Sequence, residues 1–204
     1  FARLQDDDMR AWMRSHDLGL EGEAARSILD LAEGSPGTAM FAARHRLHEW
    51  VRSLASELDR VAAGDYPQKL GDLLAKHVDD LAKAIVKERE KGVEDEVITD
   101  TDDEDDESSS AADGQPKSKA SKQSANLEAA GWMTVVLGHL ARRRLRDAVE
   151  ANRDPSPWLA LIDRIAEAER AVRSNMNLRH IYSALVIAGA DDAATVAHGG
   201  GVGR

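Results

Sequence analysis

The sequence from Trp158 to Leu185 reads WLALIDRIAEAERAVRSNMNLRHIYSAL, and this stretch decides the fold. Ser156 can cap a helix just before it, and Pro157 suits the first turn of that helix. Apolar residues then recur at helical spacing, at Trp158, Leu161, Ile162, Ile165 and Val172. The pattern predicts an amphipathic helix whose apolar face needs a partner surface.

An asparagine-rich break follows this helix. Asn175 and Asn177 interrupt the periodicity, and either residue can adopt a left-handed turn or cap the next helix. Gly189 lies where the C-terminal cap of that next helix is expected. The second apolar stripe consists of Leu178, Ile181, Leu185 and Val186. Two successive stripes predict a helical assembly rather than an isolated helix.

Helical patterns also fill the first third of the chain. The acidic residues Asp6–Asp8 can cap a first helix, and a second helix is expected to end at Gly34. Ser35 and Pro36 repeat the cap-and-proline start. They open one long helix with apolar residues at Met40, Leu47, Trp50, Val51, Leu54, Leu58 and Val61.

Two further segments of the chain show helical periodicity. One begins at Pro67 and fades over residues 87–92, and the other resumes near Leu127. No run alternates apolar and polar residues with β-branched enrichment, as a strand would. An all-α fold is therefore expected.

The charge of the chain is concentrated in one segment. The formal net charge is −10, and Glu94–Glu107 holds ten acidic residues without a Lys or Arg. Outside that run 27 acidic residues face 27 basic ones, so the remainder has no overall electrostatic reason to bind nucleic acid. Residues 93–124 are expected to be a disordered acidic, Ser- and Lys-containing insert, and residues 190–204 a flexible tail.

The sequence lacks the features of several classes of protein. It contains no Cys, which excludes disulfides and thiolate zinc sites and fits a cytoplasmic location. There is no membrane-length apolar run, no signal peptide, no phosphate-binding loop and no nucleophile turn. We therefore expect no catalytic site, cofactor or metal site. Because the chain starts at Phe1, we also expect it to be a fragment or a processed product.

Two segments carry a resemblance to a known family. The turn Ala32-Glu-Gly-Ser-Pro-Gly-Thr-Ala-Met40, and the arrangement of helix, Ser-Asn-x-Asn-Leu and helix around Ser174–Leu178, resemble the delta-prime subunits of bacterial DNA polymerase III clamp loaders. The resemblance covers roughly Phe1–Ala43 and Trp132–Ala188. It implies a three-helix AAA+ lid over residues 1–45 and a helical collar domain over residues 46–189.

The resemblance also implies a function. ATP-hydrolysing relatives place a phosphate-sensing Arg where this chain has Gly37, and glycine cannot supply that charge. The implied role is a non-hydrolysing structural subunit that contacts the delta subunit and the ATP-hydrolysing gamma/tau-type subunits. Contact with the sliding clamp and with primer–template DNA would be indirect. The residues expected in the core of the collar are Trp158, Ile162, Ile165, Leu178, Ile181 and Leu185.

The expected subunit contacts are polar residues in or between the two helices predicted on either side of the asparagine-rich break: Arg164, Arg173, Asn175 and Asn177. The expected lid turn consists of Gly34, Ser35, Pro36 and Gly37. Its local chemistry favours ordinary helix punctuation over a nucleotide-proximal hinge.

Other functions remain open. The chain could be a generic helical protein-interaction adaptor, or a helical nucleic-acid-binding module that uses Arg142, Arg143, Arg144 and Arg146. These arginines point around a helix, with Asp147 and Glu150 close by, which favours a solvated or subunit-facing surface over DNA contact. His45 and His48 have a metal-like spacing without a third ligand nearby, and are expected to face solvent.

Overall fold

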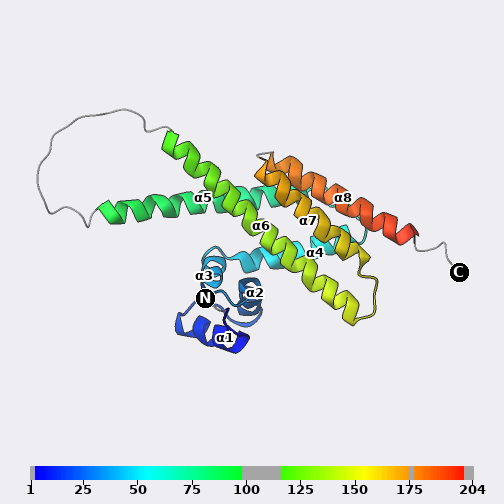
Figure 1. The fold of residues 1–204 in the computed structure, drawn as a ribbon, viewed down its shortest axis with the longest axis horizontal. Coiled ribbons are helices and arrows are strands. Elements are labelled where there is room, and N and C mark those ends of the chain that lie inside the picture. Colours follow the sequence, from blue (N-terminus) through cyan, green and yellow to red (C-terminus); the bar gives the residue numbers. More distant parts are fainter. Residues whose placement is uncertain (1–2, 98–115, 175–176, 200–204) are drawn as a thin grey trace, which may run out of the picture.

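The computed structural model describes residues 3–97, 116–174 and 177–199, and all of its regular structure is helical (Figure 1). The all-α prediction is therefore confirmed. The helices are α1 (Asp6–Ser15), α2 (Gly22–Ala32), α3 (Pro36–Arg44), α4 (Leu47–Ala62), α5 (Leu70–Val97), α6 (Pro116–Glu150), α7 (Ser156–Arg173) and α8 (Leu178–Gly199). Over this part of the chain, every helix falls short of the length or apolar character needed to cross a bilayer.

The four longest C-terminal helices pack in a closed order. Helix α5 packs on α6, α6 on α7, α7 on α8, and α8 returns to α5. Helix α4 lies against α6 and α8, so it closes one side of this group. Figure 1 shows α7 and α8 running side by side, while α1, α2 and α3 gather beside α4 and α6.

One apolar core runs through the short N-terminal helices and the longer helices that follow them. Its fully buried members include Ile28 of α2, Leu54 of α4 and Leu161 of α7. Tyr182 of α8 is also buried, at 1% exposure. Because the core passes from α2 into α4 and α6, the residues expected to form a lid domain and a collar domain share packing at their junction.

Glycine allows two of the helix contacts to be unusually close. A Cβ atom at Gly71 of α5 would lie 2.9 Å from the backbone nitrogen of Ser183 in α8. At Gly189 it would lie 3.0 Å from Val61 Cγ1 of α4 and 3.2 Å from Leu161 Cδ1 of α7. Side chains at these positions would push α8 away from its neighbours.

The close contact at Gly189 explains one wrong prediction. We expected a C-terminal cap there and a flexible tail from residue 190, but α8 continues to Gly199. Ala190 and Ala193 are buried on the continued helix. Small residues in this turn fit against α4 and α7, so tertiary packing extends a helix that local punctuation would end.

The long helix predicted to start at Pro36 is also wrong, because it is two helices. Helix α3 ends at Arg44, and Arg46 adopts a left-handed conformation with φ 56° before α4 begins at Leu47. The mixed three- and four-residue spacing of the apolar residues was compatible with either arrangement.

Helices cover both ends of the expected insert. Helix α5 extends to Val97 and α6 begins at Pro116, so residues 93–97 and 116–124 are helical. Residues 98–115 lie outside the described residues. In α6 Met133 and Leu137 are buried, whereas Val135 and Val149 are exposed.

Candidate functional site

The predicted lid turn joins α2 to α3 and is built by backbone geometry. Glu33 and Gly34 both have positive φ, at 45° and 81°, which reverses the chain after α2. The amide of Leu4 donates to the Gly34 carbonyl at 2.9 Å, so the N-terminal segment is tied to this turn. Ser35 Oγ accepts from the Thr38 amide at 3.3 Å, and Pro36 occupies the first position of α3. The predicted cap-and-proline start is therefore confirmed.

A hollow of about 570 Å³ lies between this turn and α6. Trp132 and Val135 of α6 line one side of it, and Pro36 lines the other. At its rim Glu33 lies 3.1 Å from Arg3 and 3.8 Å from Arg142, so both guanidinium groups are paired with the same carboxylate. Gly37 is not among the lining residues, and a Cβ there would meet nothing within 4 Å. An alanine at this position would therefore meet no steric obstacle.

Arg164 forms hydrogen bonds to two carboxylates of its own chain. Its Nε donates to Asp192 Oδ2 at 2.7 Å and its Nη2 to Asp192 Oδ1 at 3.2 Å. Nη1 also donates to Glu167 at 2.7 Å. These hydrogen bonds raise the pKa of Arg164 and clamp α7 to α8. This expected subunit contact has partners within its own chain.

The other expected contacts lie near the turn between α7 and α8. Arg173 is exposed at the end of α7 and pairs with Glu169, at 2.6 Å. Asn177 Oδ1 accepts from the Arg179 amide at 2.9 Å, so it caps α8, as predicted. Asn175 lies outside the described residues. Ser156 forms no side-chain cap of α7; its amide instead donates to Asp154 Oδ1 at 2.9 Å.

The burial predicted for the residues of α7 and α8 is partly wrong. Ile165, Ile181 and Leu185 are buried, in agreement with the prediction. Trp158, Ile162 and Leu178 are only half-buried and pack at the edge of the core. The buried face of α7 is rotated toward Leu161, Ile165, Ala168 and Val172.

The two candidate histidines occupy a different environment from the predicted one. The side chain of His45 is only 5% exposed and lies against Phe41, which stacks on Trp132 of α6. His45 Nε2 lies 3.5 Å from Glu88 of α5. Burial lowers the pKa of His45, although Glu88 opposes the effect. The described residues contain no group of three potential ligands that could hold a metal.

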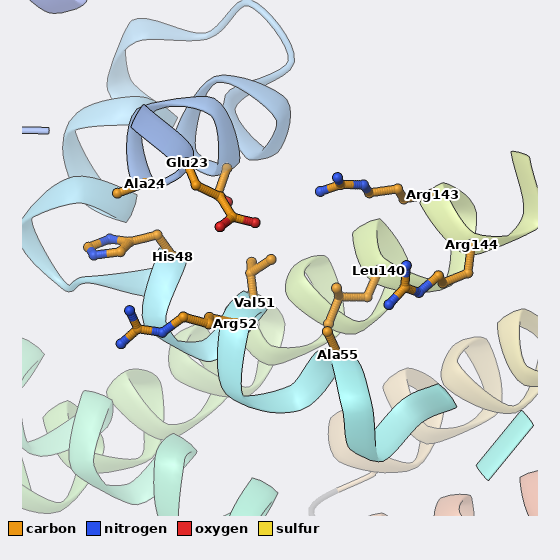
Figure 2. Close-up of a pocket in the computed structure, with 10 residues that line it drawn as sticks. Glu23, Ala24, His48, Val51, Arg52, Ala55, Leu140, Arg143 and Arg144 are labelled. Atoms are coloured by element: carbon orange, nitrogen blue, oxygen red, sulfur yellow. The ribbon is translucent and has the colours of Figure 1, made fainter. Parts of the chain in front are cut away.

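The arginine cluster lies where α6 crosses α2 and α4. A cleft of about 220 Å³ is lined by Glu23 and Ser27 of α2, Arg52 of α4, and Arg143 and Arg144 of α6, among others. Figure 2 shows Arg143 extending from α6 toward the α2 side, where the Glu23 carboxylate lies. Arg52 lies beside His48 at the α4 edge (Figure 2). Two helices besides α6 thus contribute charged groups to the cleft.

A second hollow adjoins this cleft and shares Arg143 with it. It measures about 440 Å³ and is lined by Arg26, Asp30, Glu33, His139, Arg142, Arg143, Arg146 and Asp147. His139 is 6% exposed, and its Nε2 has no hydrogen-bond partner in the described part of the chain. Burial lowers the pKa of His139; Asp30 opposes this, and Arg143, Arg142 and Arg146 reinforce it.

Sequence reasoning identified the arginines of α6 but missed two residues of this site. Arg26 and Arg52 lie on α2 and α4, more than 90 residues before Arg143 in each case. Each follows an ordinary pattern of exposed charge on a helix, so nothing in the local sequence marks it. Only the crossing of the three helices brings the groups together.

Comparison of the chain with protein-family models, with curated proteins and with solved structures finds no match.

Proposed function

We propose that this chain is the lid and collar portion of a clamp-loader subunit of the delta-prime type. The observation that carries the proposal is the order of its parts. Three short helices close on the Gly34–Gly37 turn, and a set of longer helices follows, ending in the hairpin of α7 and α8. The proposed role is structural: to help hold the loader together while ATP-driven subunits open the sliding clamp and place it on primed DNA. A cytoplasmic location belongs to the same proposal.

The chemistry of the lid turn supports a non-hydrolysing role. Gly37 carries no charge where the resemblance places a phosphate-sensing Arg. The two arginines at the rim of the neighbouring hollow are both paired with Glu33. Recognition of a nucleotide phosphate at the turn would require those pairs to separate. Negligible ATP binding by the chain, measured by titration calorimetry, is the expected result.

The hairpin of α7 and α8 has exposed side chains that could contact partner subunits. Leu159 of α7 and Ile187 of α8 are 49% and 46% exposed although they are large and apolar. Arg173 is exposed near the turn of the same hairpin. Exposed apolar side chains and exposed arginines are both common in protein interfaces. A protein-interaction role therefore fits this part of the molecule.

The direct test is assembly with the proposed partners. The full chain is mixed with the delta and gamma/tau-type subunits of the same cell, and complex formation is followed by light scattering after gel filtration. We expect a joint complex that Arg173→Ala weakens. Arg10→Ala is the matched control, because Arg10 is also exposed and paired within its own helix, α1.

The generic adaptor is the competing proposal. A correctly folded chain that binds none of these subunits would contradict the clamp-loader proposal and favour the adaptor. The domain context separates the two independently: an AAA+ core in the same polypeptide would favour the clamp loader, and any other accompanying domain would favour the adaptor.

A further inference from the structure

Two hollows share Arg143 in their lining, and we call them together the arginine groove. Its charged lining consists of Arg26, Arg52, Arg142, Arg143, Arg144, Arg146, Glu23, Asp30, Glu33 and Asp147. Six arginines therefore face four carboxylates on a chain whose overall charge is −10. The local excess of positive charge is opposite in sign to the charge of the whole molecule.

Internal ion pairs occupy only part of this lining. Arg144 donates to both carboxylate oxygens of Asp59, at 2.8 and 2.7 Å, and Arg142 pairs with Glu33. Among the described residues, the other four arginines form no ion pair: Arg26, Arg52, Arg143 and Arg146. Glu23 and Asp30 are the lining carboxylates that likewise form none. The groove thus retains a net excess of two unpaired positive charges.

A buried histidine adds an unused hydrogen-bonding atom. His139 lines the second hollow, and only 6% of the residue's surface is exposed. Its Nε2 has no partner within the described residues. Burial of an imidazole nitrogen without a partner carries a free-energy cost.

We propose that the arginine groove binds the phosphate backbone of a nucleic acid. Guanidinium groups recognise phosphate oxygens through paired donors, and four arginines without ion pairs line the two hollows from α2, α4 and α6. The lining contains no Trp, Tyr or Phe on which a base could stack, and of its two histidines His139 is buried. The groove is therefore suited to the backbone rather than to base edges, and the expected binding is independent of sequence. This inference does not depend on the clamp-loader proposal.

Affinity and salt dependence test the proposal on the full chain. The probe is a fluorescent 20-base-pair DNA duplex, titrated at several salt concentrations. Arg143→Gln combined with Arg146→Gln removes two unpaired charges. We expect this double variant to bind roughly tenfold or more weakly at low salt and to reduce the slope of log affinity against log salt by about 2.

The matched control is Arg153→Gln combined with Arg170→Gln. Both of these arginines are exposed, lie outside the groove and form no side-chain ion pair in the described residues. The control changes the net charge by the same amount, so it should leave affinity and slope nearly unchanged. Equal losses in the two double variants would overturn the proposal, because they would indicate attraction by net charge alone.

A second variant and two competitors keep the test decisive. If the groove variant unfolds by circular dichroism, Arg52→Gln, an exposed position on α4, replaces it, with an expected loss of several-fold. Polyglutamate should compete poorly; equal competition would assign the groove to acidic peptides and overturn the proposal. Inorganic phosphate that shifts the NMR signals of His139, without duplex binding, would assign it to a small anion instead and also overturn it.

Discussion

The three short N-terminal helices and the five longer helices after them are stabilised in different ways. Helices α1, α2 and α3 have 10, 11 and 9 residues and depend on turns with positive φ, such as those at Gly34 and Arg46. Helices α5, α6 and α8 have 28, 35 and 22 residues and are stabilised by long apolar faces. Helix α8 also lies close to α5 at Gly71, and to α4 and α7 at Gly189. Short helices need defined ends, whereas long helices need matched faces.

The largest expected effect tests the packing of the longer helices. Leu161 is 1% exposed and contacts the α8 region at Gly189, so Leu161→Ala should reduce the free energy of unfolding by about 2 to 5 kcal/mol. Ile162→Ala, one residue along, should cost less because Ile162 is half-buried. Urea denaturation of the two variants measures the difference. Equal losses would mean that α7 buries a broader face than the structure indicates.

A glycine substitution tests the dependence of the short helices on their turns. Gly34 has φ +81°, and a Cβ there would lie 2.5 Å from the Leu4 carbonyl oxygen. Gly34→Ala should therefore reduce the free energy of unfolding by about 1 to 3 kcal/mol. Gly37→Ala is the control, because Gly37 lies within α3 with open space around it. A neutral Gly34→Ala variant in thermal melts would show that the turn is not required.

Gly71 provides the corresponding test in the longer helices. Its conformation is helical, so alanine gains helix propensity of about 1 kcal/mol. The added methyl group would meet the backbone of Ser183, which should cost about 1 to 3 kcal/mol and leave a small net loss. Hydrogen exchange should show weakened protection in α5 and α8 specifically. A stabilised variant with normal protection would contradict the close approach of these helices.

Buried histidines predict a decline in stability with acidity at the junction of the two regions. Burial lowers the folded-state pKa of His45, His77 and His139 below the ordinary value near 6.5. The unfolded chain then binds protons more readily than the folded one, so stability is present above that value and falls as the pH drops through it. Melts at pH 7.5 and pH 5.5 check this. His139→Gln should reduce the difference, and an unchanged pH dependence in all three single variants would exclude the histidines as its source.

The smallest expected effect concerns the ion pair between α7 and α8. Arg164 and Asp192 are about one-third exposed, so solvent screens much of their attraction. Arg164→Ala should lower the thermal midpoint by no more than about 4 °C. A double-mutant cycle with Asp192→Ala measures their coupling. A loss as large as that of Leu161→Ala would show that polar clamps, rather than apolar faces, hold the hairpin together.

Local sequence signals predicted part of the fold and of the candidate sites well. The Ser35-Pro36 helix start and the Asn177 cap appear where the sequence placed them, because caps involve residues only a few positions apart. The interruption at Arg46 and the continuation of α8 through Gly189 were not predictable in this way. Both depend on what distant helices require of the backbone.

The sequence by itself determined the helical class, the approximate apolar faces and the chemistry of the lid turn, because helical periodicity and capping act within a few residues. The tertiary structure decided which part of each face is buried: it rotated α7 toward Leu161 and left Trp158 at the edge of the core. It also decided the partners of the charged groups. Arg164 faces Asp192 of α8, while Arg143 lines one hollow with Arg52 and the other with Arg26. Such arrangements arise from helix crossings between residues far apart in the chain, and no local pattern specifies them.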